Sequence, residues 1–275
     1  MTFQEKGLSR NTIDKYYTIQ SIVSHVVEMA KTHLNINKLN DLIIEPSAGN
    51  GSFLQSLKNI CNNCIFLDIL PEHPDIKNQD YLQFQVPNNL HSGKIHIVGN
   101  PPFGRQSSLA IKFIKHSSKF ANSISFILPK SFKKESMSRH FPINFHLILE
   151  LDIPDNSFIV NGETHNVQCV FQIWEKRNEN RKLVERETPI NFKFVKKNEP
   201  HDISFRRVGV YAGKVDTDTT NKSEQSHYFI KLDKEITEDL LIELNNIDYK
   251  NKNDTVGPRS ISKNELIREF NLVIV

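Results

Sequence analysis

The sequence has little glycine and little cysteine, and it has no long apolar run. Its 275 residues include ten glycines, about half the ~7% of average usage, and three cysteines. No apolar run approaches the roughly 18 residues that a membrane-spanning helix needs, so we expect no membrane partner. Three cysteines are too few for a disulfide scaffold, which favours a reducing, intracellular location in the cytoplasm, the nucleoid or the nucleus.

The few glycines that are present cluster in one stretch of the chain. Five of the ten fall between residues 49 and 104, namely Gly49, Gly51, Gly93, Gly99 and Gly104. A glycine-poor chain that concentrates glycine in this way uses it there for backbone geometry. We therefore expect tight turns, and the chemistry that such turns permit, in this stretch.

Positive charge is concentrated in the middle of the chain. The formal net charge is +3, but residues 175–214 hold eleven Lys and Arg against six Asp and Glu. The members of this basic belt that would suit the phosphates of a nucleic acid are Arg177, Arg181, Lys182, Arg186, Lys193, Lys196, Lys197, Arg206 and Arg207. A solvated charged surface explains the same charges equally well.

Strand and helix patterns alternate over the first two-thirds of the chain. Short apolar runs predict strands at 41–45, 64–68, 94–98, 124–128, 145–151 and 167–174. Apolar residues at helical spacing predict helices at 18–33, 52–60 and 108–120. This alternation is typical of an α/β fold with a mostly parallel sheet, in which ligands bind beyond the carboxyl ends of the strands. After Glu175 the pattern weakens, apart from a helix expected within 235–247.

Acidic residues and glycines stand directly after the predicted strands. The segment from Glu45 to Gly51 leaves a strand through a turn in which Gly49 and Gly51 let a ligand approach the backbone closely. Asp68 ends the next strand, where a carboxylate accepts hydrogen bonds from both hydroxyls of a ribose. Asp80 can accept from an exocyclic amino group. Each acid alone is compatible with an ordinary turn, but together they outline a pocket for an adenosine-bearing cofactor.

The segment Asn100-Pro101-Pro102-Phe103 follows another predicted strand. Its two prolines stiffen the backbone and remove N–H donors. What remains is the side-chain carbonyl of Asn100, the backbone carbonyl of Pro101 and the ring of Phe103. This acceptor pair beside a stacking surface suits the amino group of a planar base. The alternative interpretation is a rigid turn.

In this order, the motifs resemble those of class I S-adenosylmethionine-dependent amino-methyltransferases. The segment Lys15-Tyr-Tyr-Thr18 resembles the one that precedes the glycine turn in gamma-class adenine-N6 DNA methyltransferases. The resemblance covers about residues 14–176. It implies a Rossmann-like class I methyltransferase fold, S-adenosyl-L-methionine as cofactor, and methyl transfer to the exocyclic N6 amino group of adenine in DNA.

The resemblance also implies roles for individual residues. The implied cofactor contacts are Tyr17, Thr18, Glu45, Gly49, Gly51, Asp68, Asp80 and Tyr81. The implied catalytic motif is Asn100, Pro101, Pro102 and Phe103. Phe158 is implied to stack on an extruded base, and Lys130, in the loop after the next strand, is implied to contact the substrate.

The same resemblance predicts a methyltransferase domain at 1–176 and a small accessory, target-recognition region at 177–275. DNA-methylating members of the family often carry a larger recognition domain. The substrate alternatives are therefore adenine N6 or guanine N2 in RNA, or a protein glutamine amide. A protein partner that supplies recognition is a further alternative, as is a silent nucleic-acid-binding subunit.

No metal site is predicted. Cys61 and Cys64 have C-x-x-C spacing, but zinc needs two further ligands and only Cys169 remains among the cysteines.

Overall fold

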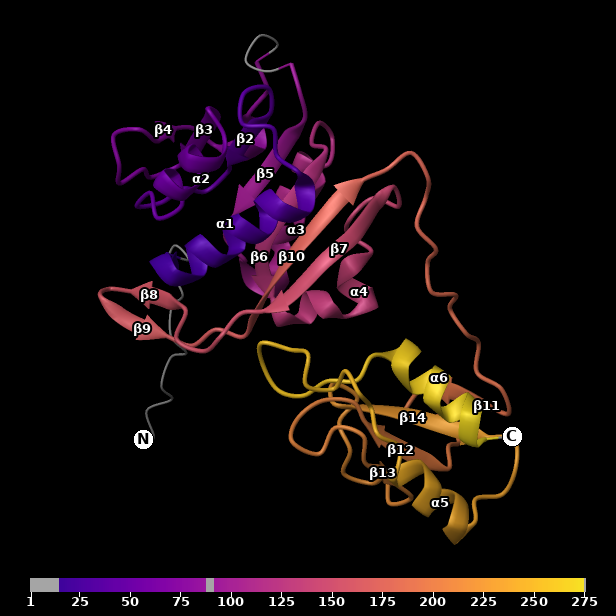
Figure 1. The fold of residues 1–275 in the computed structure, drawn as a ribbon. Coiled ribbons are helices and arrows are strands. Elements are labelled where there is room, and N and C mark those ends of the chain that lie inside the picture. The colour runs from indigo at the N-terminus through magenta and orange to yellow at the C-terminus, as the bar shows by residue number, and fades with distance from the viewer. Residues whose placement is uncertain (1–14, 88–91, 275) are drawn as a thin grey trace, which may run out of the picture. The chain divides into compact units, whose positions relative to one another are not determined.

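The computed structural model describes residues 15–87 and 92–274 (Figure 1). These residues form two compact units. The first comprises the described residues of Met1–Pro129 together with Arg139–Arg181, and the second comprises Lys130–Ser138 together with the described residues of Lys182–Val275. Residues 1–14 of the predicted methyltransferase domain lie outside the described residues. The predicted functional division between 1–176 and 177–275 stays a proposal.

A seven-stranded sheet forms the centre of the first unit, with the strand order β4-β3-β2-β5-β6-β10-β7. The strands are β2 (Leu42–Glu45), β3 (Asn63–Asp68), β4 (Lys77–Asn78), β5 (Ile95–Gly99), β6 (Ser123–Pro129), β7 (Phe145–Asp152) and β10 (Cys169–Lys176). Strand β2 runs parallel to β3 and β5, β3 to β4, and β5 to β6, whereas β10 is antiparallel to both neighbours. The predicted Rossmann-like, mostly parallel sheet is confirmed.

Two helices pack with one face of this sheet. Helix α1 (Gln20–Leu34) buries Ile22, Val23, Val26, Val27, Ala30 and Leu34. This spacing gives one continuous apolar face, which shares a hydrophobic core with α2 (Leu54–Ile60) and with side chains of the central strands. Helix α3 (Ser108–Ser117) buries Phe113 and Ile114. The helix expected from residue 18 begins at Gln20, because Thr18 lies in a strand.

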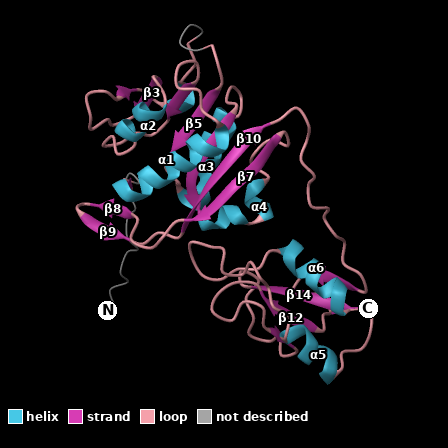
Figure 2. Ribbon diagram, viewed as in Figure 1, coloured by secondary structure: helices cyan, strands magenta, loops and turns pink. Residues whose placement is uncertain are grey.

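A second, small sheet joins the segment before α1 to a distant hairpin (Figure 2). Strand β1 (Tyr17–Thr18) pairs with β8 (Phe158–Val160), and β8 pairs with β9 (Glu163–His165). Thr18 stands opposite Phe158. Strands of two or three residues are too short to show an alternating pattern, so the sequence did not predict this sheet.

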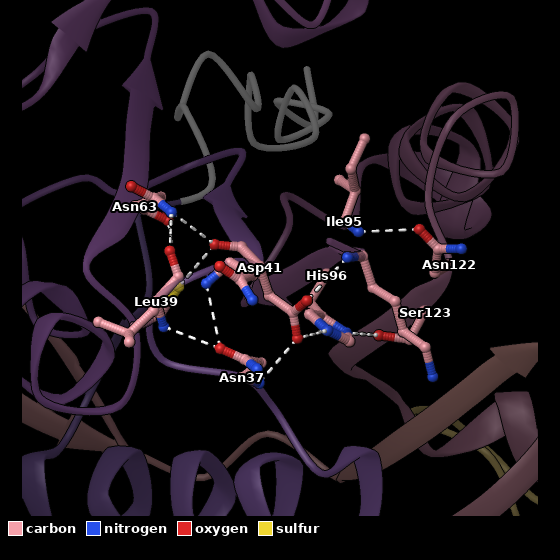
Figure 3. A network of polar contacts seen from close by, with 11 residues as sticks. Asn37, Leu39, Asp41, Asn63, Ile95, His96, Asn122 and Ser123 are labelled. Atoms are coloured by element: carbon pink, nitrogen blue, oxygen red, sulfur yellow. Dashed lines mark hydrogen bonds and ion pairs between the residues drawn. The ribbon is translucent and has the colours of Figure 1, made fainter. Parts of the chain in front are cut away.

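A buried polar network ties the amino ends of three central strands together (Figure 3). The ring of His96 contacts Ser123 Oγ through Nδ1 at 2.7 Å and Asp41 Oδ2 through Nε2 at 3.1 Å. Asp41 also accepts the backbone N–H groups of Asn37 and Lys94. Burial lowers the pKa of His96. Burial opposes ionisation of Asp41, but the two backbone donors and the ring of His96 together outweigh it and lower the pKa of that carboxyl.

The second unit is a four-stranded antiparallel sheet packed with helices, in the order β11-β14-β12-β13. Its elements are α4 (Glu135–Ser138), β11 (Phe192–Val195), β12 (Ile203–Arg206), β13 (Val215–Asp216), β14 (His227–Leu232), α5 (Glu238–Asn245) and α6 (Lys263–Val273). The helix expected within 235–247 is confirmed as α5. Helix α6 was not predicted, although Ser262 and Glu265 form a capping box at its start.

Within residues 15–87 and 92–274, no helix combines the length and the apolar character that crossing a membrane requires.

Candidate active site

A cavity of about 310 Å³ lies where β2, β3 and β5 end at their carboxyl edge. Its wall brings together most of the residues that the sequence singled out, although they come from distant parts of the chain. The predicted residues on this wall are Tyr17, Thr18, Glu45, Gly49, Asp68, Asp80, Tyr81, Asn100 and Pro102. The carboxyl end of a parallel sheet is where such folds bind ligands.

Five predicted residues are not on this wall. Gly51 and Pro101 are sequence neighbours of wall residues, and Phe103 packs partly against the hydrophobic core. Phe158 is 1% exposed within that core, so its ring presents no face to solvent. Lys130 belongs to the second unit. The roles of these residues stay predictions.

The glycine turn is held by Asp68. Gly49 and Gly51 have φ values of +52° and +85°, which L side chains rarely adopt, so glycine is required at both positions. Asp68 Oδ2 accepts the N–H of Gly49 and Oδ1 accepts the N–H of Leu70, both at 2.8 Å. Each carboxylate oxygen has a second lone pair. Asp68 can therefore hold the turn and still accept hydrogen bonds from a ligand.

Glu45 brings an unpaired carboxyl group to the cavity. Its side chain is 1% exposed, and Oε2 has no hydrogen-bond partner among the described residues. Burial, together with the charge of Asp68, raises the pKa of Glu45 well above its ordinary value. Because an unpaired buried carboxylate is costly, a cationic ligand group would be favoured beside it.

Asn100 offers a second unpaired oxygen. Its Nδ2 donates to the backbone carbonyl of Tyr16 at 3.1 Å and to Thr18 Oγ1 at 3.3 Å. Its backbone carbonyl accepts the hydroxyl of Ser47 at 3.0 Å. The side-chain Oδ1 is buried and has no partner within the described residues. The side chain is thus fixed by its nitrogen and leaves its oxygen available as an acceptor.

The segment from Lys15 to Thr18 lies across the glycine turn. The hydroxyl of Tyr17 donates to Glu72 Oε1 at 2.7 Å, and Lys15 Nζ contacts the same oxygen at 2.5 Å. Glu72 in turn donates its backbone N–H to the carbonyl of Gly49. A Cβ at Gly49 would lie 3.0 Å from Cε1 of Tyr17. Hydrogen bonds from Lys15 and Tyr17 lower the pKa of Glu72.

Asp80 and Tyr81 differ in what they present to the cavity. Asp80 is exposed, and its Oδ1 accepts the N–H of Leu82 at 2.9 Å at the start of a 3₁₀ turn, Tyr81–Gln83. Tyr81 is 1% exposed, and its hydroxyl lies 2.7 Å from Ser117 Oγ. Burial raises the pKa of Tyr81. Tyr81 therefore contributes apolar wall, and polar recognition at this end depends on Asp80.

Among the wall residues that the sequence did not assign to the site are Tyr16, Ser47 and Glu72. Tyr16 and Ser47 lie inside motifs that were recognised, so their neighbours were the only signal for them. The ring of Tyr16 is 37% exposed and meets Phe158 and His165 edge to face. Nothing in the sequence around Glu72 indicated its contact with a segment 55 residues away.

Part of the predicted basic belt is used inside the fold. The guanidinium of Arg181 donates to the backbone carbonyls of Pro142, Phe145 and Phe141 and lies over the ring of Trp174. Other members pair locally: Arg177 with Glu175, Lys197 with the carbonyl of Lys222, and Arg206 with the carbonyl of Val208. These side chains are less available to phosphates than their number suggests.

Within the described ranges, no group of three or more His, Cys, Asp or Glu side chains is arranged to hold a metal ion.

No protein-family model matches the sequence. Curated relatives include the Ribosomal RNA small subunit methyltransferase A of Francisella tularensis subsp. novicida, 29% identical over 144 residues, and that of subsp. tularensis, 28% identical. Each match covers 47% of this chain and 51% of the relative, so the chain spans about half the length of the curated relatives it matches.

Solved structures with some likeness include the 23S rRNA methyltransferase ErmE, with a TM-score of 0.43, 13% identity and coverage of 62% of this chain and 72% of that one. Another is the N-methyltransferase NodS from Bradyrhizobium japonicum, with a TM-score of 0.39, 12% identity and coverage of 57% and 95%. Likeness at this level says nothing about activity.

Proposed function

We propose that this protein transfers the methyl group of S-adenosyl-L-methionine to the exocyclic N6 amino group of an adenine in RNA. The proposal depends on one observation above all, the buried and unpaired Oδ1 of Asn100 on the wall of the cavity. An acceptor left unpaired inside a protein is costly unless a ligand pairs with it. An amino group that donates one N–H to this oxygen and one to the carbonyl of Pro101 keeps its lone pair free for attack.

S-adenosylmethionine is the cofactor that the fold class implies, and the residues present fit it. When bound, it supplies an electrophilic methyl group on a sulfonium. The unpaired carboxyl of Glu45 suits its cationic amino acid end, Asp68 suits the ribose hydroxyls, and Asp80 suits the adenine amino group. A cavity of about 310 Å³ is at the small end of the range for ligand sites, roughly 300–1,000 Å³.

In this proposal the side chains of the cavity orient the amino group and the cofactor, and none of them acts as a general acid or base. Asn100 is oriented by Tyr16 and Thr18, and its backbone is held by Ser47. When the nucleophile is already held in line with the electrophile, the loss of rotational and translational entropy occurs on binding, and the barrier of the transfer step is lower. Tyr16, on the same wall and partly exposed, is suited to stack on the base.

RNA is favoured as the polymer because the curated relatives are named as ribosomal RNA methyltransferases. The second candidate is adenine N6 in DNA, which the Asn100-Pro-Pro-Phe103 resemblance to gamma-class enzymes supports. The relatives share only about half their length with this chain, so the polymer is the part of the proposal that most needs a direct test.

The test is to incubate the full chain with methyl-labelled S-adenosylmethionine and either total RNA or DNA, and then to digest each polymer to nucleosides. We expect N6-methyladenosine in the RNA, formed about 10²–10³-fold more slowly with the Asn100→Ala variant. Label in deoxyadenosine would select the DNA candidate. If no nucleoside is labelled and calorimetry detects no cofactor binding, a silent nucleic-acid-binding subunit becomes the better description.

A further inference from the structure

The second unit contains a positively charged cavity of its own, about 420 Å³ in volume. Three basic side chains, Lys134, Arg207 and Lys263, line it together with Tyr228 and serine hydroxyls. Among the residues that the structure describes, no acidic one lines it. A hollow with cations, hydroxyl donors and one aromatic ring has the chemistry that binds phosphate groups of a polynucleotide.

Arg207 is held in one orientation at this cavity. Its guanidinium carbon lies 5.4 Å from the centre of the Tyr228 ring, and Nη2 donates to the backbone carbonyl of Gln225 at 2.8 Å. Its Nε is buried without a hydrogen-bond partner among the described residues. Because the guanidinium presents a planar fork of donors, a fixed Arg binds phosphate with less loss of side-chain entropy than a free one.

Two lysines play different parts around Arg207. Lys134 is 7% exposed, donates to the carbonyl of Ser260 at 2.6 Å and lies 3.7 Å from Glu265, so its charge is largely used within the fold. Lys263 is exposed, and its Nζ lies 3.9 Å from the centre of the Phe194 ring. Lys134 thus anchors the segment that carries Lys263, while Lys263 and Arg207 both line the cavity and each lies over an aromatic ring.

We propose that this cavity, defined by Arg207, Lys263 and Tyr228, binds the phosphate backbone of a single-stranded RNA segment. The choice of RNA depends on the proposed function above; the phosphate chemistry does not. Phosphate contacts position a strand without reading its sequence. The site therefore supplies affinity for the polymer, and the catalytic cavity supplies the choice of base.

The test compares two double variants of the full chain that lose the same charge. R207A/K263A removes the two cations of the cavity, whereas K250A/R268A removes an exposed Lys and an exposed Arg that do not line it. Binding of a fluorescently labelled single-stranded RNA is followed by anisotropy across a range of salt concentrations. Circular dichroism melting checks that both variants fold.

We expect R207A/K263A to bind roughly tenfold more weakly than K250A/R268A near physiological salt. The slope of its plot of log affinity against log salt concentration should be less steep by about 1.4, because two phosphate contacts to a single strand are lost. A matched DNA strand should show the same loss.

Equal affinity and equal salt slopes for the two variants would overturn the inference, and so would a wild-type chain that does not bind RNA. RNA binding that depends on the cavity, in a chain that labels no nucleoside, would contradict the proposed function and leave the phosphate site standing. If only K263A loses affinity and R207A behaves as wild type, the assignment to Arg207 is wrong.

Discussion

The side-chain nitrogen of Asn100 donates to the backbone carbonyl of Tyr16, 84 residues earlier in the chain, at 3.1 Å. The same nitrogen donates to Thr18 Oγ1. These two acceptors determine which way the amide points, so Oδ1 is the atom that remains for a ligand. The residue thus combines two tasks, because it holds the N-terminal segment over the cavity and presents an acceptor to it.

The first prediction separates these two tasks of Asn100. Asn100→Ala removes the acceptor and the two donated hydrogen bonds together, so we expect kcat for methyl transfer to fall by about 10²–10³-fold and cofactor binding to weaken as well. Asn100→Asp keeps an acceptor but cannot donate to Tyr16 and Thr18, so its cofactor binding should weaken to a similar degree while its kcat falls less. Single-turnover kinetics and calorimetry measure the two effects. An Asn100→Ala variant with the kcat of the wild type would rule out the proposed role.

The second prediction concerns the aromatic side chain that contacts the base. Tyr16 is partly exposed and Phe158 is buried. Tyr16→Ala should weaken substrate binding by about 1–3 kcal/mol, the usual worth of stacking on a base, with little change in the free energy of unfolding. Phe158→Ala should cost about 3–5 kcal/mol of stability through the cavity it leaves. Urea unfolding measures the change in stability of each variant, and KM measures the change in substrate binding. A wild-type KM in Tyr16→Ala would show that Tyr16 does not stack on the base.

The third prediction is a pH dependence set by Glu45. Its pKa is raised in the folded chain, so between the unfolded and folded pKa values the native state holds a proton that the unfolded state has released. The contribution of Glu45 to stability is therefore full at pH below its unfolded value and falls as pH rises, by up to about 1.4 kcal/mol per pH unit. Glu45→Gln, which cannot ionise, should gain stability relative to wild type as pH increases from 5 to 8.

Cofactor binding should change the protonation state of Glu45. A cationic ligand beside Glu45 favours the carboxylate, so cofactor binding should release a proton in the wild type and none in Glu45→Gln. Calorimetry in buffers of different ionisation enthalpy counts these protons. Proton release that is unchanged in Glu45→Gln would assign it to another residue.

The fourth prediction concerns His96, at the opposite ends of the strands from the cavity. His96→Leu removes the ring contacts of both Asp41 and Ser123. Asp41 keeps the backbone N–H groups of Asn37 and Lys94, whereas the hydroxyl of Ser123 loses its ring partner, so we expect a cost of about 1–3 kcal/mol of stability. Cofactor affinity at a temperature where the variant is folded should stay that of the wild type. A large loss of affinity in a folded variant would show that the network also shapes the cavity.

The sequence by itself determined most strands of the central sheet and nine of the residues on the cavity wall. Strands such as β2 and β6 are buried along their whole length and mostly apolar because both faces of a parallel sheet are covered, and such segments can be recognised without a structure. Residues that directly follow these strands, such as Asp68 and Asn100, meet at one edge for the same topological reason.

Only the tertiary structure decided which side chains complete the site. The contacts of Tyr16 with Asn100 and of Glu72 with Tyr17 join segments 84 and 55 residues apart, and no local pattern encodes them. The same holds for Phe158, which the core buries, and for Arg181, which carbonyl groups of its own unit engage. Periodicity reports the face on which a residue lies, whereas the partner it meets there depends on how the whole chain packs.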